Sequence, residues 1–308
     1  MIKKKANTNV LTVIMFTANN MIIDRLFEEV QKFGPICVGL DTDLSYIPEH
    51  LNSIESIADR VFKFNKDIID ASYDLVAVYK LQIAYYEALG VEGLVAYKKT
   101  LEYLREKNKL SIGDIKRSDI AKTAEMYAKA HFEGDFEADF ITLSPFMGYD
   151  SIKPYLPYLE SGEKGIFVLL RTSNPGALDI EYLESKGETL YNIIGDNLSK
   201  IADRYIGDYG YSSLGFVVGD NIMDSGEQDE IRKRFPREFF LVPGYGAQGG
   251  KASTVRKLLT ELNGGIVNSS RGIITSHMKH MEDADYKSEN YLQYIREAVI
   301  NMKEDICG

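Results

Sequence analysis

Cysteine and histidine are scarce in this chain of 308 residues, which limits the kinds of site it can carry. The two cysteines, Cys37 and Cys307, form no motif, so we expect free thiols, no disulfide framework and a reducing compartment, the cytoplasm. Of the four histidines, only His277 and His280 could share a helix face. No cysteine or acidic pattern accompanies them, so we expect ordinary surface residues and no metal site.

Long apolar runs and excess positive charge are also missing. No apolar stretch reaches the roughly 18 residues of a membrane span. The formal net charge of −10 disfavours binding to nucleic acid or anionic lipid, although lysines in a cleft can still hold a small anion. Residues 1–20 contain lysines and a short apolar run broken by threonine, without a clean signal-peptidase site. We expect a dispensable tail there and a single folded domain over 21–308.

The remaining sequence alternates short apolar runs with helical periodicity, as in 53–73 and 85–109. Buried parallel strands that alternate with amphipathic helices give this pattern. Eight such units predict a single-domain α/β protein with the (β/α)₈ barrel fold. A doubly wound open sheet is the alternative, but no G-x-G-x-x-G follows the first apolar run. The predicted strands lie within residues 35–41, 75–82, 109–116, 139–145, 165–172, 213–220, 239–246 and 264–270.

Charged residues gather where the first three predicted strands end, which in a barrel is the catalytic face. Asp41 ends the first strand, Lys80 lies in the second, and Asp114 and Lys116 lie two apart in the third, on one face. Asp119 follows at the start of a helix. An ion pair at a helix start would explain one such pair but not charges on three strands. We therefore predict an alternating chain of lysines and aspartates, in which the carboxylates keep Lys116 charged.

Glycine-rich turns follow the seventh and eighth predicted strands, where barrels commonly bind phosphate. They read "VPGYGAQGGK" (242–251) and "NSSRGI" (268–273). Gly250 lets backbone N–H groups approach an anion, Gln248 offers a neutral donor, and Arg271 can grip phosphate oxygens. These could be plain turn glycines, but their position favours a phosphate site. The longest irregular piece, 171–190, follows the fifth strand and is expected at the same face.

These segments together resemble the orotidine 5′-phosphate decarboxylase family, in its longer type 2 form. The resemblance covers about residues 34 to 272. It rests on "DIKRSDIAKT", "GLDTD", "YKLQIAYYEALG", "LSPFMGYDSIKPYL", "LLRTSNPGA" and the two glycine-rich turns. It implies decarboxylation of orotidine 5′-monophosphate (OMP) to UMP in pyrimidine biosynthesis, by a homodimer that uses no metal or organic cofactor.

The resemblance also implies a role for each matching residue. Lys116 would protonate C6 of the pyrimidine, Asp114 would face the departing carboxylate, and Lys80 and Asp119 would complete the charged array. Asp119 and Thr123 would serve the partner subunit's site. Substrate contacts would come from Asp41 (ribose), Ser144 (pyrimidine), and Gln248, Gly250 and Arg271 (phosphate).

Three other functions fit parts of the pattern. A metal-dependent relative acting on a sugar phosphate would need an acid where Lys80 stands. A Schiff-base aldolase would need a lysine in an apolar pocket rather than Lys116 between carboxylates. A catalytically inactive nucleotide-binding barrel would bind UMP without turnover, yet no catalytic group is missing here.

Overall fold

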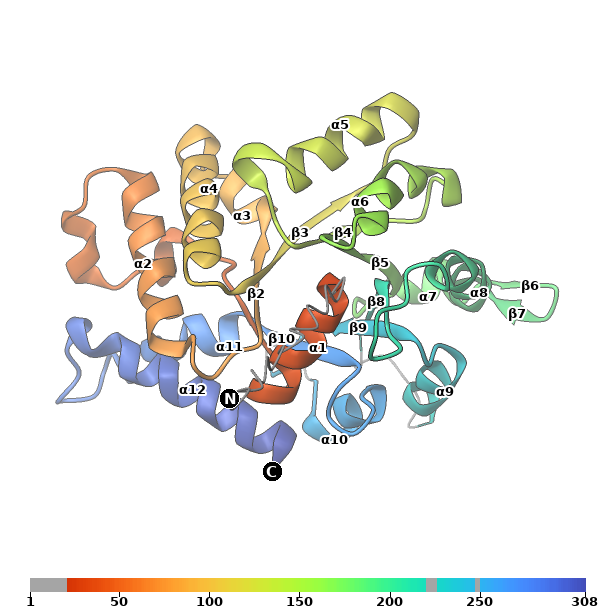
Figure 1. Cartoon of the computed structure of the whole chain (residues 1–308). Helices are drawn as coiled ribbons and strands as arrows, with labels where there is room; N and C mark the ends of the chain where they lie inside the picture. Colours follow the sequence, from red (N-terminus) through yellow and green to blue (C-terminus); the bar gives the residue numbers. More distant parts are fainter. Residues whose placement is uncertain (1–20, 220–225, 247–249) are drawn as a thin grey trace, which may run out of the picture.

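The chain folds into a closed barrel of eight parallel strands surrounded by helices (Figure 1). This computed structural model describes residues 21–219, 226–246 and 250–308; the expected tail 1–20 lies outside the described residues. The strand order is β1-β10-β9-β8-β5-β4-β3-β2. The closed barrel confirms the predicted fold and rules out the open sheet, and every predicted strand is present. The barrel strands are β1 (Ile36–Gly39), β2 (Val78–Gln82), β3 (Leu110–Arg117), β4 (Phe140–Leu143), β5 (Gly165–Arg171), β8 (Ser212–Val218), β9 (Glu238–Val242) and β10 (Gly265–Ser269).

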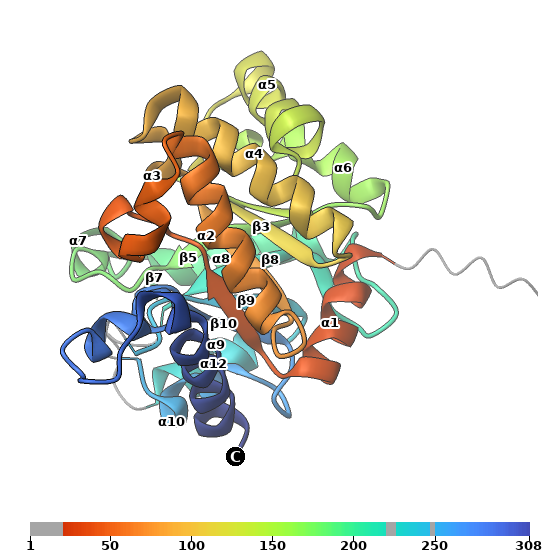
Figure 2. The same cartoon turned by 90° about the vertical axis from the view of Figure 1, so that its left-hand side faces the viewer.

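The helices lie outside the barrel, and both views show α2 packing near the C-terminal helix α12 (Figure 2). Helix α2 shows why these segments become helices. Ser56 caps its first turn by accepting a hydrogen bond from the backbone of Asp59, and its apolar residues share one buried face. The helices that follow the strands or end the chain are α2 (Ile57–Ser72), α3 (Ile83–Glu87), α4 (Gly90–Glu106), α5 (Ala121–Phe132), α6 (Leu156–Glu160), α8 (Leu190–Ala202), α9 (Glu227–Arg234), α10 (Ala252–Val255), α11 (Arg271–Ile274) and α12 (Tyr291–Cys307).

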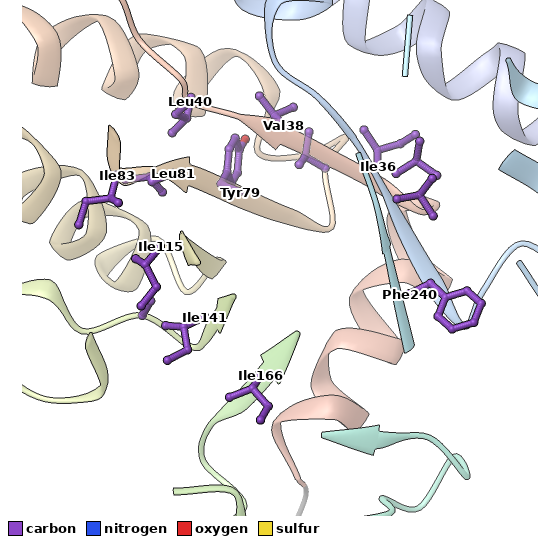
Figure 3. Close-up of a cluster of buried hydrophobic side chains, with 14 of the residues drawn as sticks. Ile36, Val38, Leu40, Tyr79, Leu81, Ile83, Ile115, Ile141, Ile166 and Phe240 are labelled. Atoms are coloured by element: carbon purple, nitrogen blue, oxygen red, sulfur yellow. The ribbon is translucent and has the colours of Figure 1, made fainter. Parts of the chain in front are cut away.

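Alternation along each strand separates two apolar layers. On β1, Val38 belongs to the larger cluster that joins strands to helices, whereas Cys37 belongs to a smaller cluster inside the barrel. Figure 3 shows members of the larger cluster, among them Tyr79 and Leu81 of β2, which point away from the barrel axis toward the helices. Lys80 lies between them and therefore points inward. Strand alternation is thus what places a charged side chain inside the barrel.

Helix α1 (Ile22–Phe33) closes the end of the barrel where the strands begin. Its Ile23 and Leu26 are buried in the same cluster as Leu110 and Phe239, which lie at the starts of β3 and β9. Asp24 is also buried and accepts a hydrogen bond from the backbone N–H of Tyr209 at 3.1 Å. This end is therefore filled, and the opposite end is left for a site.

A long excursion separates β5 from α8. It contains the short helix α7 (Ala177–Ile180) and a two-stranded antiparallel hairpin of β6 (Glu184–Ser185) and β7 (Glu188–Thr189). The hairpin extends away from the barrel, at the right of Figure 1. The sequence predicted an irregular segment over 171–190, and it did not predict this hairpin.

Candidate active site

A chain of charged side chains crosses the first three strands at the open end of the barrel. Strand register brings it together: Gly39 pairs with Lys80, and Gln82 pairs with Asp114. Lys80 Nζ lies 3.1 Å from Asp41 Oδ1 and 3.0 Å from Asp114 Oδ2. Lys116 Nζ lies 2.6 Å from Asp114 Oδ1. The described structure thus contains four linked members of the alternating chain predicted from the sequence.

The electrostatics favour the charged form of the two buried members. Burial alone would lower the pKa of Lys80, but the carboxylates of Asp41 and Asp114 outweigh it and raise that pKa above its usual range. Burial alone would raise the pKa of Asp114, but the ammonium groups of Lys80 and Lys116 hold it well below the usual range. Both groups therefore stay ionised at neutral pH.

Replacing Lys80 by alanine is expected to destabilise the fold by about 3–5 kcal/mol, because Asp41 and Asp114 would then be left facing each other without their shared cation. Urea denaturation would measure the loss in the free energy of unfolding. The matched control is Lys63→Ala, whose ammonium pairs with Asp67 at 2.6 Å on an exposed helix face. That variant should lose no more than about 1 kcal/mol. Equal losses in the two variants would contradict the structural role of Lys80.

Thr142 of β4 holds Asp114 and Lys116 in their present geometry. Its Oγ1 donates to Asp114 Oδ1 at 2.9 Å and accepts from the backbone N–H of Lys116, also at 2.9 Å. Lys116 has φ = 45°, a left-handed conformation that costs a non-glycine residue about 1–2 kcal/mol. Strain of this kind persists only where neighbouring groups hold it, and the Thr142 hydroxyl is one such group.

The charged chain forms one wall of a cavity of about 630 Å³, a size typical of small-molecule sites. Lys116 reaches into it with a side chain that is 44% exposed, so its ammonium is accessible to a ligand. The end of β5 contributes Thr172 and Ser173, and the segments after β9 and β10 contribute Tyr245 and Arg271. The cavity therefore places cationic, anionic and hydroxyl groups around one ligand-sized space.

Among the described residues, four predicted site residues do not line this cavity: Asp119, Thr123, Ser144 and Gly250. Asp119 accepts a hydrogen bond from the backbone of Ile120 at 2.8 Å, and within the described residues it forms no ion pair with Lys80 or Lys116. Thr123 is exposed on α5. Ser144 follows the end of β4 and accepts from the backbone N–H of Phe146 at 3.4 Å, so it lies in a turn beyond the cavity wall.

The predicted phosphate group is described only in part, because Gln248 lies outside the described residues. Gly250 lies at the edge of the glycine-rich turn, where its carbonyl accepts from the N–H of Gly246 at 3.3 Å. Gly246 has φ = 74°, which explains the need for glycine there. Arg271 lines the cavity with an exposed side chain.

Several cavity residues were not predicted from the sequence. Gln82 donates to Asp114 Oδ2 at 3.1 Å, and Ser270 donates to Asp41 Oδ2 at 2.7 Å. Gln82 could have been found, since it lies two residues after Lys80 on the same strand face. Thr142 could also have been found, as an inward position at the end of β4. Thr172 and Ser173 lie in the segment "LLRTSNPGA", but nothing in their spacing indicated that they would line the cavity.

The described part of the chain holds no cluster of three or more His, Cys, Asp or Glu side chains suited to a metal ion. His277 is not the surface residue expected from the sequence: it is buried against the rings of Phe64 and Tyr291, and burial lowers its pKa to about 4. His280 is exposed and pairs with Asp283 at 2.9 Å. No helix among the described residues has the length and apolar character needed to span a membrane.

Comparison with known proteins gives a consistent result. Residues 34–285 match the family described as "Orotidine 5'-phosphate decarboxylase / HUMPS family". An orotidine 5′-phosphate decarboxylase of Petrotoga mobilis is 58% identical over 289 residues, which is 93% of this chain and 98% of the relative. One from Clostridium novyi is 53% identical and covers 93% of this chain and 98% of its own. The solved OMP decarboxylase of Leishmania donovani superposes with a TM-score of 0.71 at 28% identity, covering 93% of this chain and 97% of that one.

Proposed function

The chain belongs to the orotidine 5′-phosphate decarboxylase/HUMPS family, and from that premise we propose that it is a carboxy-lyase that converts OMP to UMP and CO₂. The observation that carries the proposal is the continuous chain Asp41–Lys80–Asp114–Lys116 on the cavity wall. Relatives above 50% identity over nearly their whole length are named for this reaction. The reaction belongs to pyrimidine biosynthesis.

The chemistry follows from the charge arrangement. The bond between C6 and the carboxylate breaks, CO₂ leaves, and the electron pair remains on C6, where no ring carbonyl delocalises it well. A fixed ammonium stabilises this developing charge. In the proposal, Lys116 lies beside C6 and donates a proton from Nζ to the electron pair, then recovers a proton from water. Asp114 holds that ammonium in place at 2.6 Å and faces the leaving carboxylate.

Other groups around the cavity would hold the rest of the nucleotide. Asp41 is assigned to a ribose hydroxyl, and Arg271, with Gln248 and Gly250, to the phosphate. The position of Arg271 on the cavity wall supports this assignment. Thr142, Thr172 and Ser173 line the cavity, whereas Ser144 does not. The position of Ser144 therefore gives no support to its assignment to the pyrimidine. Contacts remote from C6 can supply binding energy that positions the reacting carbon.

The proposal includes a homodimer in which Asp119 and Thr123 complete the partner subunit's site. Both lie outside the cavity of their own chain, which is consistent with that role. The same segment carries Ile120 and Met126, which are 44% and 48% exposed and suit burial in an interface. A cytoplasmic location is also part of the proposal, supported by Cys37 and Cys307 as free thiols.

Purified protein with excess EDTA should decarboxylate OMP, seen as loss of its ultraviolet absorbance, because the proposed chemistry needs only side-chain charges. In the control assay, the same protein receives sugar phosphates and Mg²⁺ in place of OMP and EDTA, and we expect no turnover. Turnover only in the second reaction would overturn the proposal in favour of a metal-dependent relative. Binding of UMP without any turnover of OMP would identify an inactive nucleotide-binding barrel.

A further inference from the structure

Thr172, at the end of β5, is held by three of its polar atoms. Its backbone N–H donates to Glu181 Oε2 at 2.8 Å. Its hydroxyl has one proton to donate, to Glu181 Oε1 at 2.7 Å or to Asn174 Oδ1 at 2.8 Å. Its carbonyl accepts from Arg171 Nη1 at 2.9 Å. Thr172 lines the cavity, whereas Arg171 and Glu181 do not. One cavity residue is therefore fixed by two neighbours that a ligand would not touch.

Arg171 is an unusual residue to bury, with a side chain that is 0% exposed. Burial lowers the pKa of its guanidinium, and nearby acidic groups, among them Tyr182, Glu227 and Glu181, act against that effect. Glu227 is itself fixed, since it accepts hydrogen bonds from the hydroxyls of Tyr182 and Tyr191, each at 2.8 Å. A buried cation of this kind is costly unless nearby charges compensate it, and the carboxylates of Glu227 and Glu181 do so in part. Its Nε and Nη2 have no hydrogen-bond partner among the described residues.

The excursion after β5 explains how Glu181 reaches this position. Glu181 directly follows α7, and its carbonyl accepts from the N–H of Tyr191 at 3.0 Å, where α8 begins. The excursion is thereby closed upon itself, with Glu181 directed back at the strand end. The excursion therefore not only connects β5 to α8 but also brings the Glu181 carboxylate to Thr172, which lines the cavity.

Resting on the proposed decarboxylase function, we propose that Glu181 and Arg171 are positioning residues: they hold Thr172 against the nucleotide and so set the affinity for OMP. Thr172 directly follows β5, which β4 separates from β3, and among the described residues it shares no hydrogen bond with Asp114 or Lys116. A contact so placed binds substrate and transition state alike, and its loss raises KM more than it lowers kcat.

Steady-state kinetics on OMP would test this with Glu181→Ala, Glu181→Gln, Thr172→Ala and the double variant Thr172→Ala/Glu181→Ala. Glu181→Ala removes a backbone hydrogen bond to a charged carboxylate and one of the two acceptors of the hydroxyl, so KM should rise about 10-fold or more with a smaller change in kcat. Glu181→Gln keeps an acceptor and should fall between wild type and alanine. If Glu181 acts through Thr172, the double variant should raise KM no more than about 2-fold beyond Thr172→Ala.

Tyr191→Phe is the matched control, because it removes a hydrogen bond from the same cluster without contacting the cavity. Its KM should match wild type. Partial misfolding lowers apparent kcat but leaves KM unchanged, so KM separates positioning from a purely structural role. An unchanged KM in Glu181→Ala, or effects that multiply in the double variant, would overturn the positioning role alone. A wild-type protein that leaves OMP unchanged would overturn the proposed function and this inference with it.

Discussion

Lys116→Ala should abolish turnover of OMP, with kcat falling about 10⁴-fold or more. One ammonium is assigned two tasks in the proposed mechanism, since it stabilises charge at C6 and then donates the proton. General acid catalysis typically contributes about 10²–10⁴-fold, and a preorganised charge adds about 10²–10³-fold. The measurement is the rate of absorbance loss of OMP at saturating substrate, with enzyme concentrations raised for the variant.

The control for Lys116→Ala is Lys63→Ala, an exposed lysine of α2 that pairs with Asp67 at 2.6 Å outside the cavity. It should retain wild-type kcat. Binding of UMP to Lys116→Ala, followed by calorimetry, would show that its cavity remains intact. If Lys116→Ala kept kcat within about 10-fold of wild type, another proton donor would be needed and the role assigned to Lys116 would fail.

Mixing two inactive variants should restore activity if Asp119 serves the partner's site. In a heterodimer of Lys116→Ala and Asp119→Ala, one site carries both changes and the other carries neither. Random exchange makes about half of the dimers mixed, so about a quarter of all sites become wild type. Each variant alone should be nearly inactive, and the mixture, after dissociation and reassembly, should regain about a quarter of wild-type turnover.

Lys116→Ala mixed with Asp114→Ala is the matched control for this experiment. Both residues lie in one site of one chain, 2.6 Å apart, so no mixed dimer contains an intact site. That mixture should stay inactive. Failure of the Asp119 mixture to gain activity, with dimers present by analytical ultracentrifugation, would show that Asp119 does not act across the interface.

Most of the barrel could be predicted because its strands are buried on both faces and therefore stand out as apolar runs. The charged chain was predictable for a related reason: Lys80, Asp114 and Lys116 interrupt those runs at inward positions, and a parallel barrel brings strand ends together. The two-residue hairpin of β6 and β7 has no apolar run and was missed. Short exposed strands of this kind carry little sequence signal.

The finer site details could not be predicted because they depend on distances between segments far apart in the chain. Nothing in the sequence joins Ser270 to Asp41, yet their side chains meet at 2.7 Å. Likewise, the sequence locates the end of a strand only to within a few residues. It therefore could not show that Thr142 lines the cavity and Ser144 does not. His277 shows the same limit, since its burial depends on α2 and α12 packing over it.

The division of the cavity wall between strands has an evolutionary consequence. In the proposed mechanism the reacting charges come from β2 and β3, and the phosphate grip comes from the segments after β9 and β10. Loops on β5 and β9 can therefore diverge and admit a new ligand while the reacting half is inherited intact. A single replacement in the reacting half, such as an acid for Lys80, would place a third carboxylate between Asp41 and Asp114, and such a wall would attract a divalent ion. One barrel could therefore carry different chemistry through changes confined to either half of this wall.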